Sequence, residues 1–305
     1  MTAPTRTPRI AVLGSANMDL VAYVARAPRR GETVTGREFR TVPGGKGANQ
    51  AVAAARAGAT VSMIGAVGAD AHGTRLRAAL EHSGIETDLL RTVETPTGTA
   101  HIVVDDDGGN SIVVVPGANG TVTSLAPGDE GLIASADALL LQLETPLDGV
   151  LAAAGAARRH GVRTVLTPAP AQPLPPELLA AVDLLLPNEH EAAALTGIPD
   201  DPHAAARSLL QQVPEVVITL GSRGSLYAAR GAAPVTVPAQ QVTALDTTGA
   251  GDTFAGALAV ALAEGRSVGT ALAWASSAAA LSVQRSGASE SMPYRKEIDA
   301  AGPRS

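Results

Sequence analysis

The sequence predicts an α/β fold, a doubly wound and mainly parallel sheet flanked by helices, with a small β-sheet lid. Two observations carry this prediction. Short apolar runs recur along the chain, and alanine-rich stretches of helical character separate most of them. Such alternation is typical of parallel strands whose connecting helices cover both faces of the sheet. The apolar runs, in order, are RIAVLG, VSMIGAVG, ALLLQLE, VRTVLTPAP, DLLLPNE and EVVITLG.

The lid is predicted from two segments, about 20–42 and 97–117, that break this alternation. In the second segment two β-rich runs flank an Asp-Gly-Gly-Asn stretch, which is typical of a hairpin turn. We expect a small antiparallel flap that serves as a lid over the site, as a dimerisation edge, or as both. No repeat, low-complexity tract or linker divides the chain, so the sequence predicts one domain over residues 1–305.

Composition narrows the class of function. The chain of 305 residues is 45% hydrophobic, which is ample for a buried core. A net charge of -6 and an aromatic content of 2% argue against a nucleic-acid partner, which needs a basic surface and stacking side chains. The absence of cysteine excludes disulfides, thiol nucleophiles and Cys-ligated zinc. No apolar run indicates a signal peptide or a membrane span, so we expect a cytoplasmic enzyme or ligand-binding protein.

The segment 244–265, ALDTTGAGDTFAGALAVALAEG, predicts an anion site at the start of a helix. Gly249 and Gly251 allow backbone conformations that other residues disfavour, and the first N–H groups of a helix carry the positive end of its dipole. Asp252 would lie beside the bound anion, where it could accept a proton from an attacking hydroxyl. The alternative is that Asp252 only caps the helix and the glycines only turn the chain.

A second glycine-rich helix start, TVPGGKGANQAVAAARAG, places Lys46 among Gly44, Gly45 and Gly47. A lysine at a helix N-terminus opposes the dipole unless an anion offsets it, so Lys46 indicates a ligand. The stretch is not a Walker A loop, because Gly47 stands where that motif requires Ser or Thr. A glycine turn with no ligand is the alternative.

Polar residues near the end of the first predicted strand are further candidates. Asn17 and Asp19 lie two positions apart, so both side chains would face the same way if the strand continues. An amide and a carboxylate together suit sugar hydroxyls, which donate and accept hydrogen bonds. An Asx turn that closes the strand is the local alternative. Glu144 follows another apolar run without a neighbouring candidate.

Two stretches in the second half of the chain suit a nucleotide. Asn188 and Glu191 fit a capping box, which explains both, yet a strand-end Asn and Glu could also organise Mg²⁺ and phosphate oxygens. In ITLGSRGSLYA, Thr219, Gly221 and Gly224 could approach a nucleotide closely. The six histidines form no HExxH spacing, and no serine lies in GxSxG.

Together these stretches closely resemble the PfkB carbohydrate kinases, and among them the kinases of ribose. The resemblance covers almost the whole chain, in order and at family spacing, and both glycine-rich signatures, GGKGAN and DTxGAGD, are intact. The matching stretches are GSANMD, GETVTG, GGKGANQAVAAARAGA, PGAN, LQLETPL, TPAPA, PNEHEAAALTG, ITLGSRG, DTTGAGDTFAGAL and QRSGASESMPYRKEID.

The resemblance implies roles for individual residues. Catalysis is implied for Asp252 as the base, with Gly249, Ala250 and Gly251 forming the anion hole. The implied sugar site consists of Asn17, Met18, Asp19, Gly45, Lys46, Gly47, Ala48, Asn49, Glu144 and Asp252. The implied ATP site consists of Asn188, Thr219, Leu220, Gly221, Ser222, Arg223, Gly224, Gly251, Asp252 and Ser276. Ser276 departs from the family, which often has Asn or His there, and this leaves the adenine contacts open.

Two cations are implied besides ATP. Mg²⁺ would accompany the nucleotide near Glu191, which belongs to the NxxE pattern of the family. K⁺ would lie in a loop whose carbonyls supply most ligands, formed by Asp246, Thr248, Ser282, Arg285, Gly287 and Ser291. The resemblance also implies a homodimer formed through the lid and a small sugar as the partner, while composition and hydropathy argue against a nucleic acid or a membrane.

The implied activity is ATP-dependent phosphorylation of D-ribose at O5, which gives D-ribose 5-phosphate and ADP. Another sugar, such as 2-deoxyribose, fructose or a nucleoside, is an alternative, because one hydroxyl is discriminated strongly only where the site hydrogen-bonds it. A non-catalytic sugar-binding regulator that keeps the fold is a third possibility. The intact Gly249, Gly251 and Asp252 argue against it.

Overall fold

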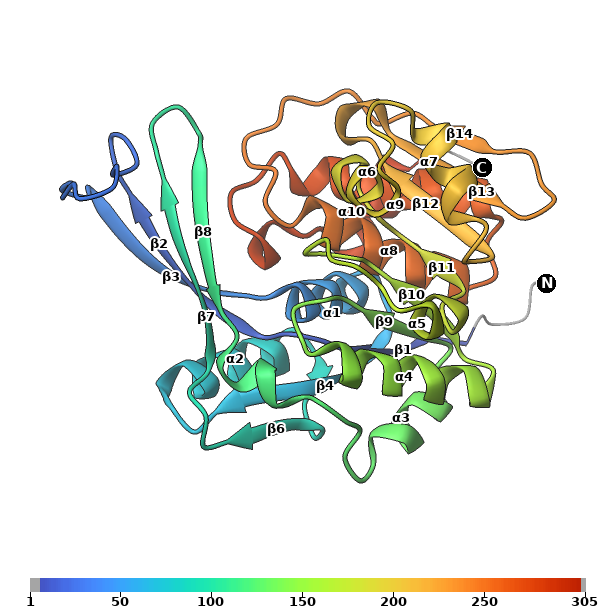
Figure 1. Ribbon diagram of the computed structural model, residues 1–305, viewed down its shortest axis with the longest axis horizontal. Helices are drawn as coiled ribbons and strands as arrows, with labels where there is room; N and C mark the ends of the chain where they lie inside the picture. Colours follow the sequence, from blue (N-terminus) through green and yellow to red (C-terminus); the bar gives the residue numbers. More distant parts are fainter. Residues whose placement is uncertain (1–5, 303–305) are drawn as a thin grey trace.

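Parallel β-strands form the centre of the molecule in the computed structural model, which describes residues 6–302 (Figure 1). Within these residues ten strands make one sheet. In sheet order they are β14 (Val235–Val237), β13 (Ser225–Ala229), β12 (Glu215–Thr219), β11 (Leu184–Leu185), β10 (Arg163–Leu166), β9 (Ala138–Leu141), β1 (Arg9–Leu13), β4 (Thr60–Gly68) and β5 (Ile85–Glu86), with β6 (Leu90–Val93) also paired to β4. Residues 1–5 and 303–305 of the predicted domain lie outside the described residues.

The sheet is parallel from β12 to β5, and β13 and β14 are added antiparallel at one edge. The predicted doubly wound, mainly parallel sheet is therefore confirmed. None of the helices in residues 6–302 has both the length and the apolar character that a membrane crossing requires.

Helices cover both faces of this sheet (Figure 1). One face packs against α1 (Lys46–Arg56), α2 (Ala71–His82), α8 (Ala250–Ala263), α9 (Val268–Ser282) and α10 (Arg295–Ala301). The other packs against α3 (Asp129–Ser135), α4 (Leu147–His160), α5 (Pro176–Ala180), α6 (Glu189–Thr196) and α7 (Pro202–Leu209). Short 3-10 turns are η1 (Gly117–Thr121), η2 (Gly221–Arg223) and η3 (Ser289–Ser291).

Strand β1 shows why its sequence is apolar throughout. Ile10 and Val12 belong to the core on the α1 and α8 side, whereas Ala11 and Leu13 belong to the core on the α4 side. Successive side chains of a strand point to opposite faces, so a strand that is covered on both faces needs a continuous apolar run. The short runs in the sequence therefore mark the buried strands of this sheet.

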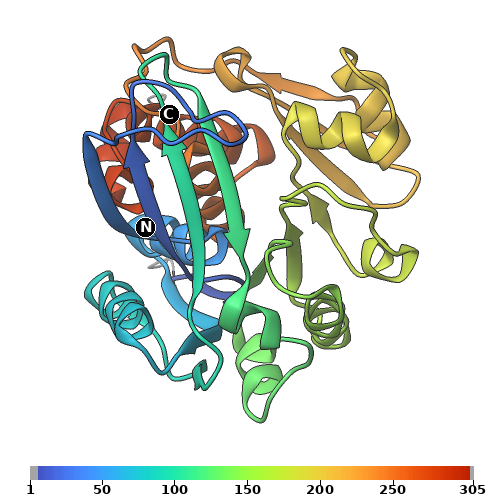
Figure 2. The ribbon, with the colours of Figure 1, turned by 60° about the vertical axis from the view of Figure 1, so that its left-hand side comes forward.

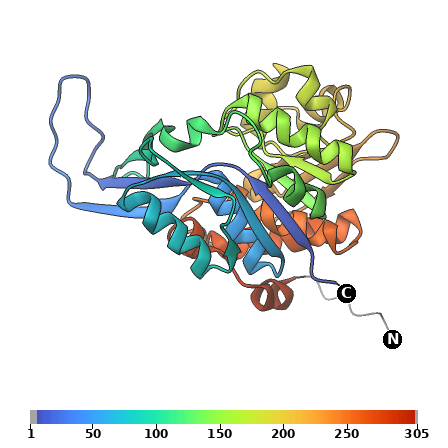
Figure 3. The same ribbon diagram turned by 90° about the horizontal axis from the view of Figure 1, so that it is seen from below.

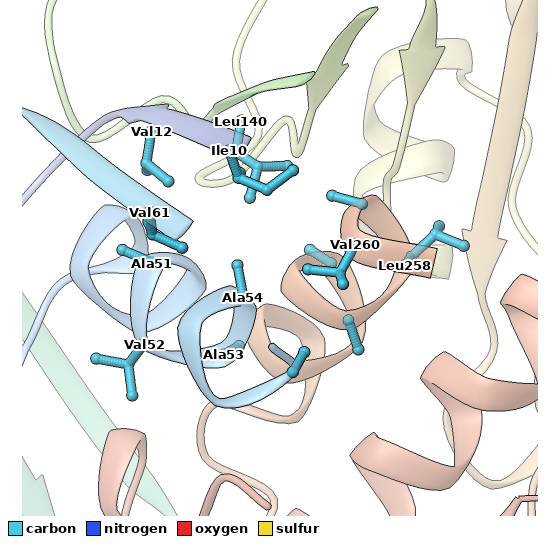
Figure 4. Packing of buried hydrophobic residues seen from close by; sticks show 14 of the residues in the cluster. Ile10, Val12, Ala51, Val52, Ala53, Ala54, Val61, Leu140, Leu258 and Val260 are labelled. Atoms are coloured by element: carbon cyan, nitrogen blue, oxygen red, sulfur yellow. The ribbon is translucent and has the colours of Figure 1, made fainter. Parts of the chain in front are cut away.

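Helices α1 and α8 pack closely because small residues line their contact. A Cβ atom at Gly256 of α8 would lie 2.6 Å from Ala53 Cβ and 2.8 Å from the Gln50 carbonyl oxygen of α1. Figure 4 shows Ala53 and Ala54 between the two helices, with Ile10 and Leu140 of the sheet above them. This contact brings the N-termini of α1 and α8, both predicted ligand sites, to the same end of the sheet.

A second sheet, the lid, stands beside the main body in Figure 1 and comes to the front in Figure 2. Within residues 6–302 it has four strands in the order β3 (Glu38–Gly44), β2 (Asn17–Tyr23), β7 (Gly98–Val104) and β8 (Asn110–Val115). The outer pairs are antiparallel, but the central pair of β2 and β7 is parallel. The predicted antiparallel flap is thus a mixed sheet, because β2 and β7 both leave the main body in the same direction. In Figure 3 the loop between β2 and β3 projects farthest from that body.

Replacing Gly256 by Ala tests the close approach of α1 and α8. We expect Gly256→Ala to lower the free energy of unfolding by about 1–3 kcal/mol, because the added methyl group must push the helices apart. Urea unfolding measures this change. Gly155 of α4 is the control, because a methyl group there would meet only the end of the Arg159 side chain, 3.7 Å away. Gly155→Ala should be neutral or stabilise by up to ~1 kcal/mol, and equal losses in both variants would contradict the explanation.

Candidate active site

The predicted site residues gather where the carboxyl ends of parallel strands meet the N-termini of α1 and α8. Ser15 follows β1 and donates to Glu144, which follows β9, over 2.6 Å. Thr167 follows β10 and lies 3.3 Å from the side-chain amide of Gln50. Ligands of open α/β sheets bind at this edge, outside the carboxyl ends of the strands.

Asp252 lies in the first turn of α8 and is only 8% exposed. Gly249 caps this helix with a φ of 73°, a left-handed conformation that favours glycine, as the sequence predicts. Gly251 differs from its prediction, because it lies inside the helix without a positive φ. It contributes open space instead, since a Cβ atom there would meet nothing within 4 Å.

The N–H groups at the start of α8 are not equivalent. The Ala250 N–H donates to the Thr247 carbonyl over 3.2 Å, so it is partly engaged within the turn. The N–H groups of Gly251 and Asp252 belong to the set that a helix leaves without an intrahelical partner. The anion site predicted for Gly249 to Asp252 therefore rests mainly on Gly251 and Asp252, and less on Ala250.

Two side-chain amides from α1 hold the carboxylate of Asp252. Asn49 Nδ2 donates to Oδ2 over 3.3 Å, and Gln50 Nε2 donates to Oδ1 over 3.0 Å. The sequence predicts Asn49 in the sugar site, whereas no sequence pattern assigns a role to Gln50. Its only signal is its place in GGKGANQ, one residue beyond Asn49.

Lys46 faces several carboxylates. Burial by itself would lower its pKa, but the charges of Asp252, Glu144, Glu191 and Asp19 outweigh burial and raise it. For Asp252, burial raises the pKa above its usual value, and Lys46 and the amides of Gln50 and Asn49 offset burial only in part. The ammonium therefore stays charged and favours the ionised form of the neighbouring acids.

Glu144 is held by three donors. Ser15 Oγ, the Lys46 backbone N–H and Asn17 Nδ2 lie 2.6, 3.0 and 3.4 Å from its Oε2. Gly45, which precedes Lys46, has a φ of 95°, and a Cβ atom there would lie 2.7 Å from the Asn17 N atom. Only glycine fits this approach, which lets α1 begin directly against the end of the first strand.

Asn17 is oriented by Asn119, a residue to which the sequence patterns attached no role. Asn119 Nδ2 donates to Asn17 Oδ1 over 2.7 Å, and Asn119 Oδ1 accepts from the Ala16 N–H over 3.0 Å. Asn119 ends the PGAN stretch, so the motif itself was visible in the sequence. With this contact fixed, the amide of Asn17 donates toward Glu144.

Three residues predicted for the sugar site have structural roles. The side chain of Met18 is fully buried in the core on the α1 side, so it does not point into the site. The Gly47 N–H donates to Ser15 Oγ over 3.3 Å, and the Ala48 N–H donates to the Ser15 carbonyl over 2.9 Å. These residues join α1 to the end of the first strand and thereby place Lys46 and Asn49.

Asp19 lies at the root of the lid, two residues beyond Asn17 on β2. Burial, and then the charge of Glu144, raise its pKa from 3.8 to about 7, against the opposing effect of Lys46. Its carboxylate lies beside Gly44 of β3, where a Cβ atom would come within 2.3 Å of Oδ2. Asp19 is thus a partly buried acceptor on the same face as Asn17, as the spacing predicts.

Next to Asp252 lies a cavity of about 270 Å³. Gly251 and Phe254 of α8 border it, as do Ser276, Ala279 and Ala280 of α9. Of the residues predicted for ATP, it is lined by Thr219, Gly221, Ser222, Gly224, Gly251 and Ser276. Leu220 is instead buried in the core, and Arg223 forms an ion pair with Glu189 at the start of α6. The other lining is largely apolar, which suits the flat face of a base.

Asn188 and Glu191 form the capping box that their spacing predicts. Asn188 Oδ1 accepts from the Glu191 N–H, and Glu191 Oε2 accepts from the Asn188 N–H, each over 2.8 Å. Burial raises the pKa of Glu191 and is only partly offset by the Asn188 N–H and by Lys46. The capping box therefore holds the Glu191 carboxylate close enough to Lys46 and Asp252 to interact with the charges of both.

The loop before α8 joins the segment after α9, as the predicted cation site requires. Asp246 Oδ1 accepts from the Thr248 N–H over 2.9 Å, and Oδ2 accepts from the Gly287 N–H over 2.8 Å. Partial burial would raise the pKa of Asp246, but these hydrogen bonds outweigh it and lower the pKa.

The side chains of three further residues predicted for this site are engaged within the protein. The hydroxyls of Ser282 and Ser291 donate to the carbonyls of Ala279 and Ala288, and the Arg285 guanidinium pairs with Glu297. No group of three or more His, Cys, Asp or Glu side chains with metal-binding geometry occurs in residues 6–302.

The fold and this site together define a phosphotransferase of the carbohydrate-kinase class. The family model described as pfkB family carbohydrate kinase matches residues 7–295, and the chain belongs to this family. It is 45% identical over 293 residues to a ribokinase of Bacillus subtilis (strain 168), covering 95% of this chain and 98% of that protein. It is 43% identical over 295 residues to a ribokinase of Haemophilus influenzae, covering 94% and 96%.

A solved structure extends this similarity to three dimensions. The Arabidopsis thaliana ribokinase complexed with ribose and ATP superposes with a TM-score of 0.92 at 37% identity, covering 97% of this chain and 99% of that chain. The sequence-based identification of the family is confirmed.

Replacing Asp19 by Asn tests the burial of its carboxyl group. Because the pKa is raised to about 7 in the folded protein, the folded state binds more protons than the unfolded chain between pH 4 and 7, and stability falls as pH rises through this window. At pH 8 and without sugar, Asp19→Asn should therefore be more stable than the parent by about 1–2 kcal/mol. Urea unfolding at pH 8 and pH 5 measures this, and the gain should shrink at pH 5. A loss of stability at pH 8 would contradict the assignment.

Proposed function

We propose that the protein transfers the γ-phosphoryl group of ATP to O5 of D-ribose, giving D-ribose 5-phosphate and ADP. One observation carries the proposal. Asp252 accepts a hydrogen bond from Asn49, which lies on the side of the polar residues Asn17 and Glu144, while its neighbour Gly251 lines the adjacent cavity. A base at this boundary lies between a sugar and a nucleotide. The ribokinases described above, one of them complexed with ribose and ATP, support this choice of substrates.

In the proposed reaction, Asp252 accepts the proton of the O5 hydroxyl as O5 attacks the γ-phosphorus. The bond from the γ-phosphorus to the bridging oxygen breaks, and ADP leaves. The N–H groups of Gly251 and Asp252 would stabilise the negative oxygens of the transferred group. Lys46, which remains charged, would neutralise part of this charge. Most of the acceleration then comes from alignment and charge neutralisation.

The sugar would be held by the polar cluster at the root of the lid. Asn17 and Asp19 offer an amide and a carboxylate on one face of β2, and Glu144 offers a further carboxylate. These groups can accept from and donate to adjacent hydroxyls. The ATP base would occupy the cavity bordered by Ser276, with Thr219 and Gly224 near the ribose and phosphates.

Two cations complete the proposal. Glu191 would hold Mg²⁺ together with the nucleotide phosphates, and bound Mg²⁺ would neutralise charge on the β- and γ-phosphates. The carbonyls around Asp246, Thr248 and Gly287 would hold K⁺, which would stabilise the loop that leads into α8. In this view the whole chain is one catalytic domain with the lid as its cover. A cytoplasmic location, and the absence of nucleic-acid and membrane partners, stay predictions of the sequence.

The first test is ADP release from ATP and Mg²⁺ with D-ribose, 2-deoxyribose, fructose and adenosine, each with and without K⁺. We expect turnover with ribose and a higher rate in K⁺. Turnover with another sugar instead would keep the kinase mechanism and replace the substrate. Binding of ribose and ATP in calorimetry, with no ADP released in the presence of any of the four acceptors, would favour the sugar-binding regulator.

Replacing Asp252 by Asn tests the base. The amide cannot accept the O5 proton, so kcat should fall by at least ~10²-fold. The affinity for ATP, measured by calorimetry, should change little, because the substitution keeps the shape of the side chain and leaves the cavity lining in place. Parent-like turnover by the variant would exclude Asp252 as the base.

We also propose that two copies of the chain form a homodimer by pairing through their lids. All six residues of β8 are exposed, and Ile112, Val113 and Val115 are 53%, 65% and 47% exposed. An apolar edge strand of this kind invites pairing with a second copy. Sedimentation should show a dimer at micromolar concentration and a monomer for Val113→Lys. Val235→Lys, on the edge strand β14 of the main sheet, is the matched control and should stay dimeric. A monomeric parent protein would refute the dimer.

A further inference from the structure

Two buried glutamines connect the interior of the sheet to the carboxylate of Asp252. Gln142 follows β9 and donates through Nε2 to Gln50 Oε1 over 2.7 Å. Gln50 in turn donates through Nε2 to Asp252 Oδ1 over 3.0 Å and lies 3.3 Å from Thr167 Oγ1. Both glutamine side chains are fully buried, at 0% exposure. The chain of contacts is therefore shielded from solvent along its length.

The contacts give each hydrogen bond a direction. Gln50 presents its NH₂ group to Asp252 Oδ1, which accepts. The carbonyl of Gln50 then points to Gln142, which must present its own NH₂ group in return. A flip of either amide would place two oxygens against each other. The two amides thus donate in one direction, from Gln142 to Gln50 and from Gln50 to the carboxyl group of Asp252.

Gln142 is itself confined. A Cβ atom at Gly14, just after β1, would lie 2.0 Å from Gln142 Oε1, so the amide is pressed against the glycine backbone. This contact leaves the Gln142 side chain little freedom to turn away from Gln50. The absence of a side chain at Gly14 therefore leaves the space that the Gln142 amide occupies.

We infer that Gln50 is a positioning residue for the catalytic base and that Gln142 fixes the orientation of Gln50. Gln50 donates to Oδ1 of Asp252 over 3.0 Å and Asn49 donates to Oδ2 over 3.3 Å, so proton acceptance falls to Oδ2, the oxygen with the longer contact and on the side of the predicted sugar site. This inference rests on the proposed function, because it assumes that Asp252 is the base of a sugar kinase.

Gln50 acts on Asp252 alongside other groups. Burial raises the pKa of Asp252; the charge of Lys46, at the start of α1, opposes burial, and that of Glu144, after β9, adds to it. Glu191 of α6 interacts with the same carboxylate. Gln50 differs from all three, because it is neutral and makes a directed hydrogen bond to one oxygen. Its loss should therefore affect both the geometry of Asp252 and its readiness to stay ionised.

The test compares Gln50→Met and Gln142→Met with the parent enzyme in ADP release with ribose. For Gln50→Met we expect kcat to fall by roughly 10- to 100-fold, the size of a lost hydrogen bond to a charged group. The ribose KM should stay within about 3-fold, and the acid limb of the kcat profile should move to higher pH. Gln142→Met should change kcat and the acid limb in the same direction but less, because Gln50 remains in place.

Thr164→Val is the matched control for removing a buried polar group. The Thr164 hydroxyl on β10 is buried and makes no hydrogen bond within residues 6–302, so its loss should leave kcat and the pH profile unchanged. ATP affinity by calorimetry and thermal unfolding check that each variant is folded. If Gln50→Met does not fold, Gln142→Met alone decides the question.

An unchanged kcat and pH profile in the folded glutamine variants would overturn the inference, as would a rise in KM with kcat retained. A loss of kcat that Thr164→Val shares would also overturn it. Absence of turnover in the parent enzyme with every sugar would instead refute the proposed function, so the two failures are distinguishable.

Discussion

The packing of α1 against α8 is the contact on which the site depends. Gly256 lets the two helices approach until Asn49 and Gln50 reach the carboxylate of Asp252, which lies 203 and 202 positions away in the chain. Both helices also begin at the carboxyl edge of the sheet, where their N-terminal dipoles converge on one region. A loosened helix contact would therefore disturb Asp252, its hydrogen bonds and the start of α8 together.

Electrostatics gives this region its second constraint. Four carboxyl groups, those of Asp19, Glu144, Glu191 and Asp252, surround the single ammonium of Lys46. Two of these acids have separate structural anchors: Glu144 has Ser15 and the Lys46 N–H, and Glu191 has the capping box. A nucleotide triphosphate adds further negative charge, so a site of this composition needs cations from solution to bind it tightly. Such a requirement agrees with the proposed Mg²⁺ and K⁺.

The residues proposed to bind the sugar, Asn17 and Asp19, belong to the lid sheet itself. Asn17, at the root of β2, pairs with Gly44 on one side and Gly98 on the other, and Asn119 fixes its side chain. Movement of the lid would therefore shift Asn17 and Asp19 relative to Asp252 on the main body. If sugar binds at Asn17 and Asp19 as proposed, these backbone pairs would couple its binding to the position of the lid.

Local patterns in the sequence determined the class of fold, the two glycine-rich helix starts, the capping box of Asn188 and Glu191, and the place of Asp252. Each of these depends on neighbours within a few residues, through periodicity, a helix dipole or a turn. The tertiary structure decided the rest. It alone showed that Met18 is core, that Gly251 supplies space rather than a turn, and that β2 runs parallel to β7. Gln50, Gln142 and Asn119 contact their partners across 92 to 202 positions of chain, and such contacts exist only once the helices and strands have packed.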